Sequence, residues 1–436
     1  MDTIITSNGG SAQVALKEQH VMREYGSFKD SRRSPIHRWF AYPAGYSHKL
    51  VEAKMRQYGL DAESLIVDPF LGSGTTTLAA ACSGIPSVGI EAHPFVSWVA
   101  KTKCTQWDAN ELRRAYNYLI ERIKSGSSDS QPIDTKGYPA LIYKCFTPGT
   151  LRDLTCVRRA VGCMGATRDF FTLALVASLR NSSTAGTGWP YIAPTKYAQK
   201  TPKTDAISTF ANQCLLMIND VESARLKADA SVVAGDSRHL TKYVGADADL
   251  IVTSPPYLNN YDYADRTRFE TYFLGLYSTW SEITAHVRDA LMTAATTQVT
   301  VSRDTEKALM PTVRSVSTVI HEEITGAMNR MSAMRAVKPG KKRYDLMTGG
   351  YFEDLTQTLV QAYDVMKPGG RAVFVLGDSA PYGVHVPTDI LAGRLGKAVG
   401  FSKYKVEVLR ARGDKWKGNT QRHHVTLRES ITTLVK

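Results

Sequence analysis

A stiff loop with one hydroxyl group, two prolines and one aromatic ring follows a short apolar run in the sequence. The run occupies residues 250–252, and after Thr253 the loop consists of Ser254, Pro255, Pro256 and Tyr257. The prolines fix the backbone and remove two N–H donors, so the Ser254 hydroxyl and the Pro255 carbonyl are left to accept hydrogen bonds. Tyr257 adds a ring face for stacking. The loop suits a planar group that carries an amine, although a strand that simply ends at two prolines would show the same pair.

A glycine-containing turn connects another apolar run to a helical pattern. Glycine allows a sharp turn and a close approach of the backbone to a ligand, and the free N–H groups of a helix start favour a negative group. The turn has neither the GK[ST] of a phosphate-binding loop nor the GxGxxG of a dinucleotide site, so both of these are excluded. A tight connection without a ligand remains the alternative. The turn reads DPFLGSGTT and contains Asp68, Phe70, Gly72, Gly74 and Thr75.

Acidic residues end three of the apolar runs, namely Asp68, Glu91 and Asp236. At the end of the second strand of a doubly wound parallel sheet, a carboxylate can accept hydrogen bonds from both hydroxyls of a ribose. We expect this role for Glu91. Asp236 could accept a hydrogen bond from the exocyclic amine of an adenine. A single acidic residue at a strand end is often an ordinary cap or a solvated group. Three together indicate a nucleoside ligand without a polyphosphate.

The elements that must position these residues alternate between strand and helix. The pattern predicts a doubly wound, mostly parallel α/β sheet, with the acidic residues and the proline loop at the carboxyl ends of its strands. Residues 75–82 and 351–366 carry apolar side chains at helical spacing. The expected strands are residues 65–67, 87–90, 232–235, 250–252 and 372–376.

Two segments, 107–228 and 279–350, are too long for simple crossovers, because most connections in such sheets span about 2–6 residues. The first contains a Ser/Gly-rich patch at 125–132, followed by an apolar helical pattern near 170–179. The second is rich in Lys and Arg after Glu323. We interpret both as partly helical insertions.

Composition narrows the class of protein. The chain has 436 residues with 43% hydrophobic and 22% charged residues, which excludes disordered and fibrous proteins. With 54 Lys and Arg against 41 Asp and Glu, the net charge is +13, which suits a polyanionic partner or a generally basic protein. Neither a signal-peptide pattern nor an apolar run of membrane-spanning length is present, so we expect an intracellular protein. Six scattered cysteines indicate reduced thiols and no zinc site.

Four motifs together resemble the amino-type DNA methyltransferases. DPFLGSGTT is followed by GIEAHP, then by GDSRHL and by TSPPYLNNYDY. The resemblance implies a Rossmann-like class I methyltransferase fold, S-adenosylmethionine as the cofactor and no metal. It also implies double-stranded DNA as the substrate and a cognate restriction endonuclease as a partner. A cytoplasmic prokaryotic enzyme is expected, and the oligomeric state stays open.

The family's roles carry over to the residues that match its motifs. Glu91 would contact the ribose and Asp236 the adenine, and residues 34–52 resemble the element that lines the methionine end of the cofactor. Ser at the first loop position resembles the enzymes that methylate cytosine at N4. The implied cofactor-binding residues are Tyr46, Asp68, Phe70, Gly72, Gly74, Thr75, Glu91 and Asp236, and the implied catalytic residues are Ser254, Pro255, Pro256 and Tyr257.

The resemblance also suggests how the chain is divided. A long recognition domain is found neither after the core nor between Asp236 and Ser254. Target recognition is therefore expected first in 279–350 and second in 107–228, with a solvated surface loop as the alternative. The expected parts are an N-terminal extension at 1–33, a catalytic core at 34–106, 229–278 and 351–436, a helical insertion at 107–228 and a basic insertion at 279–350.

The predicted reaction is methyl transfer to a cytosine that has left the DNA helix. The cytosine would stack on Tyr257 while its amine donates to Ser254 and to the Pro255 carbonyl, which aligns the nitrogen with the methyl group. Three alternatives remain open: an adenine-N6 DNA methyltransferase, a methyltransferase of RNA bases or of amides, and a catalytically silent DNA-binding subunit.

Overall fold

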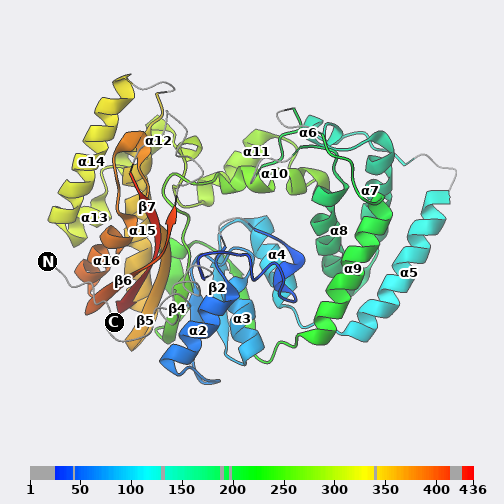
Figure 1. Ribbon diagram of the computed structural model, residues 1–436, viewed down its shortest axis with the longest axis horizontal. Coiled ribbons are helices and arrows are strands. Elements are labelled where there is room, and N and C mark those ends of the chain that lie inside the picture. The colour runs from blue at the N-terminus through cyan, green and yellow to red at the C-terminus, as the bar shows by residue number, and fades with distance from the viewer. Residues whose placement is uncertain are drawn as a thin grey trace, which may run out of the picture.

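A seven-stranded sheet forms the centre of the described part of the chain (Figure 1). The computed structural model describes residues 25–42, 45–128, 133–186, 191–195, 199–337, 341–412 and 425–436. The strand order is β3-β2-β1-β4-β5-β7-β6, and β7 runs antiparallel to both of its neighbours while the first five strands are parallel. This confirms the predicted Rossmann-like class I fold. The strands are β1 (Ile66–Asp68), β2 (Ser87–Glu91), β3 (Ala230–Ala234), β4 (Ala248–Thr253), β5 (Met366–Gly377), β6 (Lys403–Arg412) and β7 (Leu427–Val435).

Helices cover both faces of the sheet because neighbouring strand residues point to opposite sides. Ile66 and Leu250 pack with α2 (His48–Tyr58) and α3 (Thr75–Ser83), whereas Val67 and Ile251 pack with α15 (Tyr344–Val365) and α16 (Thr388–Val399). The helix α4 (Pro94–Cys104) contacts β3 and α3. Both faces of the strands are therefore buried, which explains their nearly continuous apolar runs.

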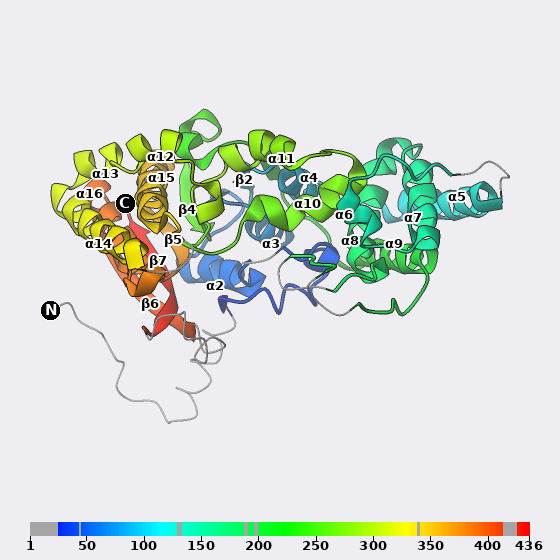
Figure 2. The same ribbon diagram turned by 90° about the horizontal axis from the view of Figure 1, so that it is seen from above.

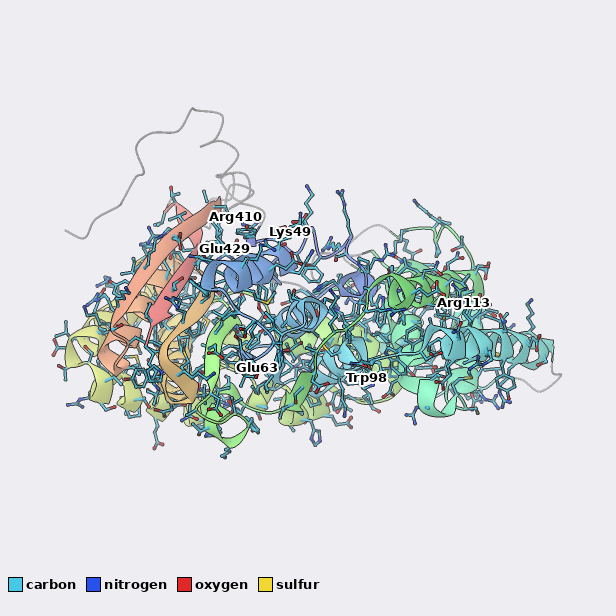
Figure 3. All side chains as sticks on the ribbon, turned by 90° about the horizontal axis from the view of Figure 1, so that it is seen from below. Lys49, Glu63, Trp98, Arg113, Arg410 and Glu429 are labelled. Carbon is cyan, nitrogen blue, oxygen red and sulfur yellow. The ribbon has the colours of Figure 1, made fainter. Side chains whose placement is uncertain are left out.

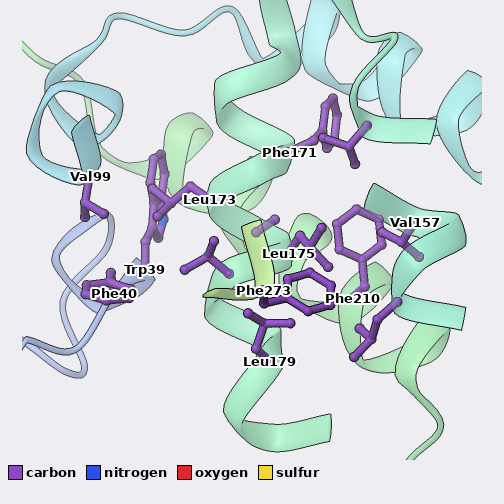
Figure 4. Packing of buried hydrophobic residues seen from close by; sticks show 14 of the residues in the cluster. Trp39, Phe40, Val99, Val157, Phe171, Leu173, Leu175, Leu179, Phe210 and Phe273 are labelled. Carbon is purple, nitrogen blue, oxygen red and sulfur yellow. The ribbon is translucent and has the colours of Figure 1, made fainter. Parts of the chain in front are cut away.

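The first insertion forms a helical lobe at one end of the molecule (Figures 1 and 2). Figure 4 shows its core, in which side chains of α8 pack toward Trp39 on one side and toward Phe210 on the other. Asp220 fastens the lobe to the core by accepting hydrogen bonds from Arg38 Nε and Trp39 Nε1 at 2.9 and 3.0 Å. Its helices are α5 (Ala109–Ser128), α6 (Ala140–Tyr143), α7 (Pro148–Val161), α8 (Arg168–Ser182) and α9 (Ala206–Ser223).

The helices of the second insertion are α11 (Trp280–His286), α12 (Val301–Lys307), α13 (Pro311–Val316) and α14 (Thr318–Val337). The last three pack on α15 at the opposite end of the molecule, whereas α11 contacts α10 (Tyr263–Leu274) toward the helical lobe (Figure 2). Residues 344–350, at its expected end, form the first turns of α15 and are mostly buried. Within the described ranges, no helix combines the length and the apolarity needed to cross a bilayer.

Short elements complete the chain around the strand ends. The helix α10 (Tyr263–Leu274) follows the proline loop and packs on the helical lobe, with the rings of Phe146 and Phe269 5.5 Å apart. The 3₁₀ turns are η1 (His37–Trp39), η2 (Gly165–Thr167), η3 (Ser237–Lys242), η4 (Arg288–Ala290), η5 (Thr296–Gln298) and η6 (Pro381–Gly383).

Candidate active site

A cavity of about 820 Å³ opens at the carboxyl ends of β1, β2 and β4. This is the edge at which open α/β sheets bind their ligands. Most of the residues expected to bind the cofactor line it, together with two residues of the proline loop. They are Tyr46, Phe70, Gly72, Thr75, Glu91, Asp236, Ser254 and Pro256. Asp68, Gly74, Pro255 and Tyr257 are not among the lining residues of this cavity.

The glycine turn depends on two left-handed residues. Gly72 has φ 56° and Gly74 has φ 91°, a region that other residues rarely adopt. Gly72 faces the cavity, whereas a Cβ atom at Gly74 would lie 3.4 Å from the Cβ of Ala100 in α4. Gly74 therefore shapes the turn and permits close packing against α4.

Glu91 ends β2 with its carboxylate at the cavity wall. Its two oxygens accept hydrogen bonds from the backbone N–H groups of Gly72 and His93, both at 2.8 Å. Burial raises the pKa of Glu91 to about 7, against these two hydrogen bonds, which lower it. A carboxylate has about four lone-pair sites, so two acceptor positions remain for the hydroxyls of a ribose.

Asp236 follows β3 and is held by a neighbouring arginine. Arg238 donates to both carboxylate oxygens, with its Nη2 2.7 Å from Oδ2. Burial alone would raise the pKa of Asp236, but the hydrogen bonds and charge of Arg238 bring it below its ordinary value. Arg238 also pairs with the buried Asp354 of α15 at 2.7 Å. Asp236 is thus an oriented, ionised acceptor at the cavity wall.

Asp68 connects the glycine turn to the proline loop. It is buried and accepts hydrogen bonds from Thr253 Oγ1 and Thr76 Oγ1, both at 2.6 Å, and from the Phe70 N–H at 3.0 Å. The Tyr46 hydroxyl donates to it as well, at 3.2 Å. Burial raises the pKa of Asp68, and these hydrogen bonds oppose the shift. Asp68 therefore holds the end of β4 next to the turn.

The proline loop separates this cavity from a second one. The second cavity, of about 840 Å³, lies on the Tyr257 side of the loop, and Tyr42 and Gly45 line both cavities. The Tyr257 hydroxyl donates to Glu429 Oε1 at 2.8 Å, and the Arg412 guanidinium lies 4.9 Å from the centre of the Tyr257 ring. The other residues that line it are Gly26, Ser27, Phe28, Lys29, Arg32, Asn260, Tyr261 and Arg410.

Sequence reasoning missed several residues at both cavities. Tyr42, Tyr263 and Met292 line the first cavity, and Met292 belongs to the second insertion. In the second cavity Arg410 and Glu429, adjacent in Figure 3, come from paired positions of β6 and β7. Tyr263 could have been found from the sequence, because it is an aromatic residue only six positions after Tyr257 of the proline loop. Nothing in the local sequence marks Glu429 as a partner of Tyr257.

Comparisons with known proteins find similarity to DNA methyltransferases. A family model described as DNA methylase matches residues 17–102, which include the glycine turn and Glu91. The chain is 26% identical to the type II methyltransferase M.BsoBI of Geobacillus stearothermophilus, over 94% of this chain and 87% of that protein. It is 21% identical to M.AvaI of Nostoc sp., over 90% of this chain and 84% of that protein. A shorter match, 29% identical over 22% of the chain, is to M.MjaII of Methanocaldococcus jannaschii.

The segment matched by the family model contains residues that line the cavity at the strand ends. The fold, the lining of the cavity and the full-length similarity agree with the motifs found in the sequence. The chain is therefore similar over most of its length to type II DNA methyltransferases, and its residues 17–102 match the DNA methylase family, which uses S-adenosylmethionine as its cofactor.

Proposed function

We propose that this protein transfers a methyl group from S-adenosylmethionine to the N4 amine of a cytosine in double-stranded DNA, as the modification enzyme of a type II restriction-modification system. The observation that carries the proposal is the position of the Ser-Pro-Pro-Tyr loop between two cavities. Ser254 and Pro256 face the cavity at the strand ends, while Tyr257 faces the second cavity. A loop in this position can hold an amine from one side against a methyl donor on the other.

The first cavity suits the cofactor. Glu91 retains acceptor positions for the two ribose hydroxyls, and Asp236 is fixed as an acceptor for the adenine amine. Apolar side chains of Phe70, Ile90 and Met292 supply faces for the base. The bound cofactor supplies an electrophilic methyl group on a sulfonium sulfur. The chain's own contribution is to bind and orient this group.

The target amine would be held by the proline loop. It would donate one hydrogen bond to the Ser254 hydroxyl and one to the Pro255 carbonyl, which directs the nitrogen toward the methyl group. The base would stack on the Tyr257 ring. Arg412 covers that ring in the protein without DNA, so the entering base must displace its guanidinium.

The second cavity suits the target nucleotide because of its charge. It is lined by four cations, Lys29, Arg32, Arg410 and Arg412, and by one carboxylate, Glu429, which is itself paired with Arg410. A surplus of positive charge beside a flipped base favours contact with the flanking phosphates. The base sequence would be read by the second insertion, residues 279–350, or by the helical lobe.

Two substitutions in the loop test this function. Ser254→Ala and Tyr257→Ala are expected to lose methyl transfer to DNA while the fold and the affinity for S-adenosylmethionine are kept, because neither residue is needed to shape the ribose and adenine contacts. Circular dichroism and calorimetric titration of the cofactor provide the controls. Turnover at the wild-type rate in either purified variant would refute the assignment. Absence of cofactor binding by the wild type would instead indicate a silent DNA-binding subunit.

A further inference from the structure

The second insertion contributes a short segment to the wall of the first cavity. Ala290, Leu291 and Met292 line this cavity. They belong to residues 288–298, which include the turns η4 and η5 and which we call the strap. Met292 is 6% exposed, so its side chain is packed inside the protein. Part of the insertion that is expected to read DNA therefore forms part of the cavity that suits the cofactor.

A buried carboxylate on α15 holds the middle of the strap. Asp354 is 1% exposed, and its Oδ2 accepts hydrogen bonds from the Thr293 N–H at 2.9 Å and from Lys307 Nζ at 2.6 Å. Lys307 also donates to the Thr293 hydroxyl at 2.8 Å. Both the backbone and the side chain of Thr293 are therefore fixed beside α15.

The other oxygen of Asp354 connects the strap to the predicted adenine contact. Asp354 Oδ1 accepts a hydrogen bond from Arg238 Nη1 at 2.7 Å. Arg238 Nη2 donates to Asp236 Oδ2 at 2.7 Å and to the Ala290 carbonyl of the strap at 3.3 Å. Three N–H groups of Arg238 reach Asp236, so about one of the four lone-pair sites of this carboxylate stays open for an amine. One arginine thus contacts the adenine acceptor, the strap and Asp354.

A second buried carboxylate, next to the proline loop, holds both ends of the strap. Asp262 Oδ2 accepts hydrogen bonds from Arg288 Nη2 at 2.5 Å and from Thr297 Oγ1 at 2.8 Å. Asp262 precedes Tyr263, which lines the first cavity as well. The strap therefore begins and ends at one carboxylate, and its middle is held by another.

Contacts within the strap and with α15 make it a fixed wall of the cavity. The Gln298 side chain donates to the Met292 carbonyl at 3.0 Å and accepts from the Ala294 N–H at 2.8 Å. Gly350 of α15 leaves room for the strap, because a Cβ atom there would lie 3.3 Å from Thr293 Cγ2, tighter than most such contacts. The shape of this wall thus depends on the carboxylates that hold the strap.

We propose that the strap is a cofactor-binding element that the second insertion adds to the core, and that Asp354 is the residue that positions it. Asp354 sets the strap and, through Arg238, the carboxylate of Asp236, so that Met292 and Asp236 can contact the same adenine. Asp262 holds the strap without acting on Asp236. Asp354 acts through its neighbours and does not itself line the cavity. This inference rests on the part of the proposed function that places S-adenosylmethionine in the first cavity.

Calorimetric titration with two ligands tests the role of Asp354. S-adenosylhomocysteine carries the adenine amine, whereas S-inosylhomocysteine carries an oxygen in its place, which Asp236 would repel. We expect the wild type to prefer S-adenosylhomocysteine about 100-fold. Asp354→Asn should weaken its binding about tenfold and lower the preference to below about tenfold. The reason is that an amide presents its NH₂ group to either Arg238 or Lys307, which breaks one arm of the network.

A second variant separates the strap from the adenine acceptor. Asp262→Asn loosens the ends of the strap but leaves Asp236 with its arginine, so both ligands should bind about tenfold more weakly while the preference of about 100-fold is kept. Asp345→Asn is the matched control and should bind like the wild type. Asp345 also lies on α15 and pairs with Arg343 at 2.8 Å, but among the described residues no hydrogen bond or ion pair joins it to the strap.

Hydrogen exchange followed by mass spectrometry measures the contact with the strap directly. Saturating S-adenosylhomocysteine should slow exchange of the backbone amides in residues 288–298 of the wild type, and it should slow them less in Asp354→Asn. Thermal melting shows whether each variant is folded.

Three results would overturn the proposal. They are an Asp354→Asn variant that keeps either the affinity of the wild type within about twofold or its preference between the ligands, an Asp262→Asn variant that loses the preference, and unchanged exchange in the strap when S-adenosylhomocysteine binds. Failure of the proposed function is read separately, from the methylated nucleoside that the wild type makes. N6-methyladenine as the product would refute the cytosine assignment, while the same titrations still test the strap because both reactions use the same cofactor.

Discussion

Lowering the pH is expected to weaken S-adenosylmethionine binding through Glu91. The ionised carboxylate of Glu91 would accept hydrogen bonds from the ribose hydroxyls, and burial raises its pKa to about 7 in the free protein. Since protonation removes acceptor positions, affinity should follow the ionised fraction. That fraction changes about tenfold between pH ~8 and pH ~6 for a group with this pKa, which corresponds to about 1.4 kcal/mol of binding free energy.

Calorimetric titration of S-adenosylmethionine at a series of pH values measures this effect. Glu91→Gln should bind more weakly at pH ~8 and should lose the pH dependence, because an amide does not ionise in this range. Glu63→Gln, at an exposed position labelled in Figure 3, is the matched control and should behave like the wild type. An affinity that stays constant down to pH ~6, or a Glu91→Gln variant with the wild-type slope, would refute the role of Glu91.

The raised pKa of Glu91 also predicts how the stability of the cofactor-free protein depends on pH. The folded-state pKa of Glu91 is about 7 and its ordinary value is 4.5, so the folded state binds more protons between these two values. The contribution of Glu91 to the free energy of unfolding therefore falls as the pH rises through this window. In urea denaturation, the free energy of unfolding should fall less with rising pH in Glu91→Gln than in the wild type. Equal dependence on pH in the two proteins would contradict the raised pKa of Glu91.

Three further substitutions test how the site is supported. Asp220→Ala leaves Arg38 without its buried acceptor and should lower the free energy of unfolding by about 3 kcal/mol in urea denaturation; an unchanged midpoint would contradict the anchoring of the helical lobe. Lys103→Met removes the donor that holds the Ser73 carbonyl of the glycine turn at 2.8 Å, and should weaken cofactor binding about fivefold by calorimetry; an equal Kd would argue against this support. Thr253→Val removes the 2.6 Å bond to Asp68 and should slow single-turnover methyl transfer about tenfold with less than about twofold change in cofactor Kd; the opposite split would place Thr253 in cofactor binding.

Local sequence patterns were sufficient to predict the five parallel strands and the edge of the sheet at which the first cavity lies, whereas β6 and β7 were not predicted. Asp68 and Glu91 end β1 and β2, and Asp236 follows β3 at the same edge, because an acidic residue at the end of an apolar run is a local signal. The proline loop follows β4 for a similar reason. Parallel strands then bring these distant residues to one edge of the sheet.

The second cavity could not be predicted in this way, because pairings between distant residues build it. Tyr257 and Glu429 are 172 positions apart in the chain and meet only through the strand order β4-β5-β7. Likewise, Met292 reaches the first cavity from an insertion whose sequence gave no sign of cofactor contact. The ion-pair partners of the site residues could not be predicted from the sequence either. Arg238, for example, pairs with both Asp236 and Asp354.

The most direct test of the central claim is to identify the methylated nucleoside. The pure protein is incubated with unmodified duplex DNA and S-adenosylmethionine, the DNA is digested to nucleosides, and the products are analysed by mass spectrometry. We predict N4-methylcytosine, formed by the wild type and lost in Ser254→Ala. N6-methyladenine would contradict the base assignment, and absence of any methylated nucleoside on several duplex DNAs, with methylation of RNA instead, would contradict DNA as the substrate.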